Sequence, residues 1–197
     1  MKLIITHIFI AVLFINHLSG AVIHVPADTA SIQAAINIAG NGDTVLVAEG
    51  TYYENINFKG KAITVASEFI MDDDTSHISK TIIDGSQPSN PDSGSVVFFV
   101  SGEDTNSVLS GFTITGGTGT LANWDEIEFY AGGGIFVWMS DAQIRGNRIV
   151  NNYIDQTTKY CSGGGIGAYG TWINITENYI ADNTVHTNWG SGGGADI

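Results

Sequence analysis

The chain has 197 residues but very few cysteine and basic residues. Its single cysteine, Cys161, excludes an intramolecular disulfide framework of the kind that holds many small secreted domains together. Seven Lys and Arg residues stand against 20 Asp and Glu residues, for a formal net charge of −13. A nucleic-acid-binding domain needs a basic surface, so nucleic acid is not expected as a partner.

Long apolar runs are also absent, except at the beginning of the chain. Residues 1–21 predict a secretory signal peptide, because Lys2 precedes a mostly apolar run and Ser19-Gly20-Ala21 supplies small residues for cleavage. A membrane anchor is the alternative, but the run is short for a full span. We therefore expect a secreted or cell-surface protein with no transmembrane segment after signal cleavage.

Two segments of the remaining chain repeat each other. Residues 132–152, GGGIFVWMSDAQIRGNRIVNN, align without a gap with residues 163–183, GGGIGAYGTWINITENYIADN, at a shift of 31, and eight of these 21 positions are identical. A third GGG follows at residues 192–194, a further 29 residues along, and the stretch LSGFTITGG at residues 109–117 aligns with the second half of the motif at a shift of 35. A period near 30 residues predicts stacked structural repeats.

The shared pattern I-x-x-N-x-I-x-x-N places its isoleucines five residues apart, which does not match the 3.6-residue period of a helix. Short β-prone runs between Gly and Asn are typical of one coil of a parallel β-solenoid. Identical residues one period apart would then stack about 4.8 Å apart along the axis. We expect isoleucine columns in the core and asparagine ladders at the bends, with right-handed winding as the default for parallel crossovers.

These GGGI and I-x-x-N motifs resemble the right-handed parallel β-helix repeats of the pectate-lyase-like superfamily, over residues 23–197. They are also similar to the repeats of polymorphic outer-membrane proteins. Earlier in the chain, GTYYE at residues 50–54 is similar to a non-catalytic stretch of pectin methylesterases, whose catalytic motifs have no match here. The resemblance implies an all-β fold, a right-handed parallel β-helix, and carries little information about function.

The segment SIQAAINIA at residues 31–39 predicts a short N-terminal helix that caps the solenoid, with Ser31 or Thr29 as N-cap. No linker interrupts the chain, so residues 22–197 are interpreted as one β-helix domain. Its last residues start another repeat with no closing cap, so we expect the domain to be C-terminally incomplete.

Three insertions, at residues 118–131, 153–162 and 184–191, fall at equivalent points of successive repeats and predict a wall along one edge of the solenoid. Their aromatic residues beside carboxylates suit the stacking of sugar rings. The candidate substrate-binding residues are Trp124, Tyr160 and Trp189. The alternative is that these aromatic side chains cover the edge of the solenoid.

Candidate catalytic bases for lyase chemistry on uronates are Arg145, Arg148 and Lys159, although the two arginines are more often simply solvated surface charges. The negative charge, which is −14 once Lys2 is removed with the signal peptide, argues against unaided binding of a polyanion. Bound Ca²⁺ would remove that objection, and its candidate ligands are Asp72, Asp73 and Asp74, with a solvated charged loop as the alternative. The histidines show no metal-ligand spacing.

The sequence therefore predicts a secreted protein that binds or acts on polysaccharide or a cell-surface glycan. A non-catalytic cell-surface or adhesin-type solenoid is the alternative. A cationic base with clustered carboxylates on adjacent coils would favour an enzyme.

Overall fold

The computed structural model describes residues 20–197 and shows an all-β protein with parallel sheets and three short helices in that part of the chain. Most of the predicted signal peptide, residues 1–19, lies outside the described residues. No helix in the described part is long and apolar enough to cross a membrane.

Three parallel sheets form the body of the molecule. Sheet 1 consists of β1 (Val22–Val25), β2 (Thr44–Val47), β5 (Thr64–Ser67), β9 (Val108–Ser110), β14 (Ala142–Arg145) and β19 (Ile173–Thr176). Sheet 2 consists of β3 (Gly50–Tyr53), β6 (Thr81–Asp84), β10 (Thr113–Thr115), β15 (Arg148–Val150) and β20 (Tyr179–Ala181). Sheet 3 consists of β4 (Ile56–Asn57), β8 (Val97–Phe99), β13 (Ile135–Trp138), β18 (Ile166–Tyr169) and β23 (Ala195–Asp196).

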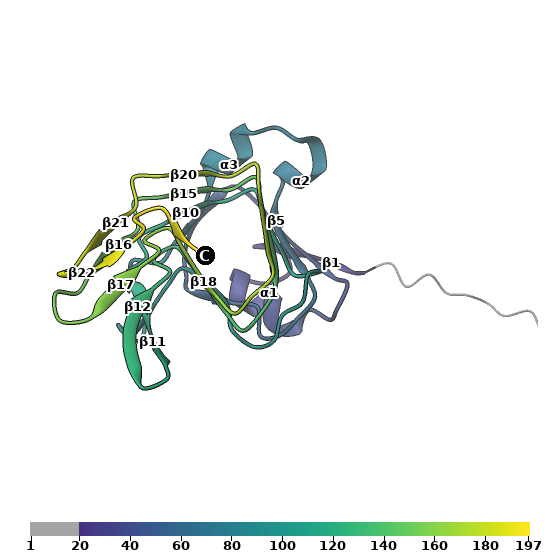
Figure 1. Ribbon diagram of the computed structural model, residues 1–197. Helices are drawn as coiled ribbons and strands as arrows, with labels where there is room; N and C mark the ends of the chain where they lie inside the picture. Colours follow the sequence, from purple (N-terminus) through teal and green to yellow (C-terminus); the bar gives the residue numbers. More distant parts are fainter. Residues whose placement is uncertain (1–19) are drawn as a thin grey trace, which may run out of the picture.

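Two further sheets extend from one corner of this body, on the left of Figure 1. Sheet 4 consists of β7 (Ser93–Gly94), β11 (Gly119–Trp124), β12 (Ile127–Ala131), β17 (Tyr160–Ser162) and β22 (Trp189–Ser191). Sheet 5 pairs β16 (Tyr153–Asp155) with β21 (Thr184–His186). The three predicted insertions supply these strands, apart from β7, and Figure 1 shows that they project from the same corner.

From β13 onwards the chain visits the sheets in a fixed order, 3-1-2-5-4, and then repeats this order. Each such circuit of the chain around the body is called a pass. In Figure 1 successive passes overlie one another along sides labelled β5, β15 and β18, one from each main sheet. The register confirms the predicted shift of 31, because Ile144 pairs with Ile175 and Ile149 with Ile180. It also confirms the shift of 35, since Ile114 pairs with Ile149.

Aliphatic columns run through the interior, as predicted. One column continues from Ile149 through Ile114 to Ile83, and all three side chains are fully buried. A second passes from Ile144 through Leu109 to Val65. Because each strand directs alternate residues inward, each pass contributes its apolar residues to one continuous core.

Asparagine ladders stabilise the bends. The Asn178 Oδ1 accepts hydrogen bonds from the Asn147 backbone N, at 2.8 Å, and from the Asn147 Nδ2, at 3.1 Å. Asn183 does the same for Asn152, at 3.1 and 2.9 Å. These side chains satisfy backbone groups that the sheet does not pair at a bend, which explains why both positions recur at the shift of 31.

The GGG triplets are required for two reasons. The first glycine of the triplet has a positive φ, +62° at Gly132 and +61° at Gly163, which other residues rarely adopt. At the second, a Cβ on Gly133 would lie 2.1 Å from the Gly164 carbonyl oxygen of the next pass. The corner therefore needs glycine for its conformation and for the close approach of backbones.

The predicted N-terminal helix is α1 (Ile32–Ile38), which packs against β1, β2 and β4 and buries Ile32, Ala35 and Ile36. The Ser31 hydroxyl caps it by accepting from the Ala34 N at 3.2 Å, as expected for an N-cap. The helix lies at the N-terminal end of the stack, within the outline of the passes in Figure 1.

Two short helices were not predicted. They are α2 (Phe69–Asp72) and α3 (Ser76–Lys80), which lie outside the body between β5 and β6 (Figure 1). The segment that contains them, residues 69–80, is called the α2–α3 excursion, and it lies where the sequence shows no repeat. Their side chains are not buried in the core, so no apolar periodicity marked them as helices.

Candidate functional site

The outer face of sheet 3 carries an aromatic strip. Phe98 of β8 and Phe136 of β13 are register partners, and their neighbours Val97, Phe99, Ile135 and Val137 belong to the interior core. Trp138 follows on the same face as Phe136 and pairs with Tyr169 of β18. Alternation along a strand therefore gives sheet 3 a second apolar face directed away from the core.

The hairpin β11–β12 covers part of this strip. Phe129 of β12 is buried, with its ring centroid 5.9 Å from Trp138 and 5.1 Å from Tyr169. The edge of the Trp124 ring meets Trp138, with centroids 5.4 Å apart and the planes at 75°. These tilted and edge-to-face contacts are the favoured aromatic arrangements, so they hold the hairpin against sheet 3.

A groove of about 470 Å³ remains beside the hairpin. Phe98, Phe136 and Trp138 form its aromatic part. Its other lining residues supply apolar groups, amides and hydroxyls: Val100, Leu121, Ala122, Asn55, Asn57, Asn123, Ser89, Ser93 and Thr120. None of the lining residues that the structure describes is charged. The volume lies in the range of small-ligand sites, which is about 300–1,000 Å³.

Two hydrogen bonds fix the polar edge of the groove. The Asn55 Nδ2 donates to the Ser95 carbonyl oxygen at 2.8 Å, which orients that amide. On the hairpin side, the Tyr130 hydroxyl donates to the Asp92 Oδ1 at 2.6 Å, beside the lining residue Ser93. Burial, together with the hydrogen bond to Asp92, raises the pKa of Tyr130 to about 12, so its hydroxyl remains a donor at neutral pH.

A smaller apolar hollow of about 170 Å³ adjoins the tip of the hairpin. It is lined by Trp124, Ile127, Phe129, Tyr160 and Tyr169. Burial raises the pKa of Tyr169 to about 12, and its hydroxyl is hydrogen-bonded to that of Ser162. The hollow therefore extends the aromatic surface of the groove to the other side of the hairpin.

The three predicted substrate-binding residues lie on this part of the molecule. Trp124 and Tyr160 line the hollow and are 47% and 42% exposed. Trp189, 63% exposed, pairs in register with Tyr160 of the preceding pass, as expected from their places before successive GGG corners. Other insertion aromatics, Phe129 and Tyr130, are buried and follow the alternative that such side chains cover the edge of the stack.

The predicted catalytic bases are not brought together. Arg145 lies on sheet 1, and Arg148 lies on sheet 2 with its guanidinium carbon 5.9 Å from the centre of the Tyr179 ring. Lys159 forms an ion pair with Glu128. None of the three lines the groove, and the described groove lining contains no carboxylate to act with them as a general acid.

The predicted Ca²⁺ ligands Asp72, Asp73 and Asp74 do not converge on one point either. The Asp74 carboxylate accepts a hydrogen bond from the Ser76 N at 2.9 Å, and Asp73 adopts a left-handed backbone conformation at the end of α2. Asp72 instead places its Oδ2 3.4 Å from the His77 Nε2. Among the described residues, these three aspartates do not form a group whose ligand atoms all lie within 4.8 Å of one another.

Sequence reasoning missed two features. The aromatic strip was partly visible, because Trp138 and Tyr169 are near matches at the shift of 31, but neither was assigned to a site. The second is the His77 cluster, in which the imidazole lies among Glu49, Glu68 and Asp72. The sequence shows no metal-ligand spacing among the histidines, and it gave no sign of this cluster because the carboxylates around His77 are separated from it by irregular intervals in the sequence.

Comparison of the chain with models of known protein families, with curated proteins and with solved structures gives no match.

Proposed function

We propose that the chain is a right-handed parallel β-helix of a secreted protein and that it binds a neutral polysaccharide in the groove beside β11–β12. The fold is supported by the repeated order of sheets and by the shift of 31 in the register. Secretion rests on the predicted signal peptide in residues 1–21.

The observation that carries the binding proposal is the composition of the groove. The half-buried Trp138 ring packs on the buried Phe98 and Phe136 and is bordered by asparagine and serine side chains. Sugar rings have apolar C–H faces and hydroxyl edges, and such a surface offers stacking to the first and hydrogen bonds to the second. The lack of charge in the described lining favours a neutral chain over a uronate.

Binding is favoured over catalysis. Glycoside hydrolysis requires two facing carboxyl groups, and lyase chemistry requires a base near the sugar. The described groove lining provides neither, and the candidate bases Arg145, Arg148 and Lys159 lie elsewhere. The polysaccharide is therefore proposed as a ligand that the groove holds without cleaving it.

The test uses an array of neutral and acidic polysaccharides, followed by isothermal titration with the best ligand. Trp124→Ala is expected to weaken binding by about 1 kcal/mol or more, because it removes a half-exposed ring that packs edge-on against the groove residue Trp138. Tyr160→Ala and Trp189→Ala should have smaller effects in that order, because the register places them one and two strands beyond Phe129, which contacts Trp138.

Trp172→Ala is the matched control. Trp172 is 81% exposed and lies next to the start of β19, where it borders a surface away from the groove. Its loss should leave the affinity unchanged. If Trp172→Ala and Trp124→Ala weaken binding equally, the groove is not the site. If no polysaccharide binds to the wild-type protein, the proposal fails and a non-catalytic adhesin-type solenoid with another ligand becomes the better interpretation.

A further inference from the structure

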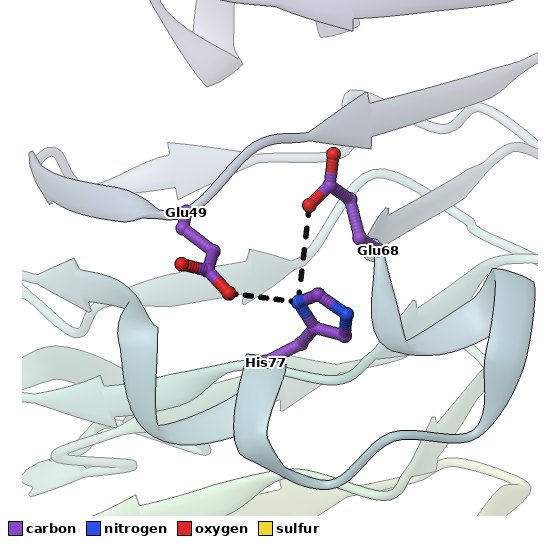
Figure 2. Close-up of side chains that lie close together, drawn as sticks. All are labelled: Glu49, Glu68 and His77. Carbon is purple, nitrogen blue, oxygen red and sulfur yellow. Dashed lines mark hydrogen bonds and ion pairs between the residues drawn. The ribbon is translucent and has the colours of Figure 1, made fainter.

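The His77 cluster joins two neighbouring passes of the chain to the α2–α3 excursion. Figure 2 shows the imidazole of His77 from α3 between the carboxylates of Glu49, which follows β2, and Glu68, which follows β5. The His77 Nδ1 lies 2.9 Å from the Glu49 Oε1 and 3.8 Å from the Glu68 Oε2. The His77 side chain is only 17% exposed, so water screens these groups less than on an open surface.

The other ring nitrogen has its own acceptor. The Nε2 lies 3.4 Å from the Asp72 Oδ2, at the end of α2. When the Nε2–H is directed at Asp72, the unprotonated Nδ1 of a neutral imidazole directs its lone pair toward Glu49 and Glu68. Metal-binding histidines are commonly oriented in this way, by a carboxylate on the nitrogen that does not bind the metal.

The net negative charge of the cluster favours a bound cation near the His77 Nδ1. Glu49, Glu68 and Asp72 carry three negative charges, and the one cationic partner within ion-pair distance of them in the described structure is Lys80, whose Nζ is 3.1 Å from the Glu49 Oε1. With a neutral imidazole the cluster has a charge of −2. A proton on His77 leaves −1, whereas a dication brings the sum to zero.

The spacing of the ligand atoms fits a small dication. One atom each from Glu49, Glu68 and His77 lies within 4.8 Å of the other two. In a tetrahedral site with bonds of about 2.0–2.2 Å, neighbouring ligand atoms lie roughly 3.3–3.6 Å apart. The separations from Nδ1 to the two carboxylates, 2.9 and 3.8 Å, bracket that range, so only small side-chain movements would be needed.

We propose that the Nδ1 of His77 and the carboxylates of Glu49 and Glu68 bind one zinc-class transition-metal dication, with Asp72 as a positioning residue for the imidazole. The nitrogen ligand separates this site from a Ca²⁺ site, which takes six to eight oxygen ligands at longer distances. Three protein ligands leave a fourth position for water.

Such an ion would fasten the α2–α3 excursion to two passes at once. Glu49 and Glu68 follow β2 and β5, which are paired strands of sheet 1, and His77 belongs to the excursion itself. Each ligand thus comes from a different segment, and the ion would cross-link them. The site lies away from the hairpin β11–β12 in Figure 1, so this inference does not depend on polysaccharide binding.

The test is isothermal titration of the chelator-treated full chain with Zn²⁺ near neutral pH. The wild-type protein should bind one zinc ion per chain. His77→Gln should weaken binding by about 100-fold or more, since it removes a ligand. Asp72→Asn should weaken it by about 10- to 100-fold through the orientation of the imidazole. In the wild-type protein, NMR should show that zinc abolishes the pH titration of the His77 imidazole, whose signal is assigned by its absence from His77→Gln.

Two matched control variants test whether other residues of the chain bind the zinc ion. His186→Gln removes an exposed histidine that also contacts a carboxylate, Asp155, at 2.8 Å. Cys161→Ser removes the buried thiol. Both variants should bind zinc as the wild-type protein does.

Three results would overturn the proposal: no zinc binding by the wild-type protein, equal binding by His77→Gln, or stronger binding of Ca²⁺ than of Zn²⁺. An imidazole that titrates unchanged in the presence of zinc would show that the cluster holds only a proton. Should His77→Gln lose its circular dichroism spectrum, Glu68→Gln provides the same test, because the Glu68 side chain is 45% exposed and its replacement keeps the shape of the side chain.

Discussion

The groove and the His77 cluster lie on different flanks of the same stack and are assembled in different ways. The groove on sheet 3 receives Phe98 and Phe136 from successive passes, which the register places side by side. The cluster collects Glu49, Glu68 and His77 from two bends and an excursion that has no counterpart in the other passes. One site is periodic and the other depends on a single insertion.

This difference decides what the sequence can predict. Ile149 and Ile180 are identical residues at a fixed shift, so their contact in the core follows from alignment of the chain with itself. The same reasoning predicts the Asn147–Asn178 hydrogen bonds. It cannot predict that His77 meets Glu49, because their interval of 28 residues matches no shift in the repeats and is set by the path of α2 and α3.

The groove is an intermediate case. Its strand positions follow from the repeat, but Phe136 pairs with Gly167 in the next pass, so the aromatic character of the position is not repeated. The hairpin β11–β12 was predicted only as an insertion. Its antiparallel pairing, with Asn123 opposite Glu128, depends on a turn with positive φ at Asp125 and Glu126, neither of which is a glycine.

The largest expected effect is on the periodic core, on which both sites depend. Ile149→Asp would place a charge in a fully buried column between Ile114 and Ile180. We expect a loss of more than about 4 kcal/mol, comparable to the whole stability of a typical domain, and therefore an unfolded protein. Circular dichroism and thermal melting measure this.

Ile149→Val is the control, with an expected cost of about 1 kcal/mol from one methyl group. If the Asp variant keeps a native β-sheet spectrum and the wild-type melting temperature, Ile149 does not face the core and the inward phase of β15 is wrong. Loss of zinc binding and polysaccharide binding together would show that both sites require the same stack.

A smaller effect distinguishes equivalent positions in two passes. A Cβ on Gly134 would lie 2.7 Å from the Gly165 carbonyl oxygen and 2.9 Å from Ile149, whereas a Cβ on Gly194 has only Ile180 within 4 Å, at 4.0 Å. Neither glycine has a positive φ, so the comparison isolates close packing. We expect Gly134→Ala to cost about 1–3 kcal/mol and Gly194→Ala to change stability by less than about 0.5 kcal/mol. Urea unfolding of both variants measures the difference, and equal costs would mean that the GGG corner is not held by contact with the next pass.

The smallest expected effect separates the two flanks. Tyr130→Phe removes the hydroxyl that donates to Asp92 and links the hairpin to the edge of the groove. We expect a loss of about 1 kcal/mol at neutral pH and weaker polysaccharide binding, with zinc affinity unchanged because the His77 cluster shares no residue with this contact.

The same variant has a defined pH dependence. Burial and the Asp92 hydrogen bond raise the pKa of Tyr130 to about 12 in the folded protein, against about 10 in the unfolded chain. Between those values the unfolded state releases its proton first, so the stabilisation from Tyr130 is complete below about pH 10 and is lost as the pH rises toward the folded value. The stability advantage of the wild-type protein over Tyr130→Phe should therefore shrink above about pH 10 in urea unfolding. An advantage that stayed constant or grew would show that Tyr130 is not held as a neutral donor to Asp92, and a change in zinc affinity would show that the two flanks are coupled through the stack.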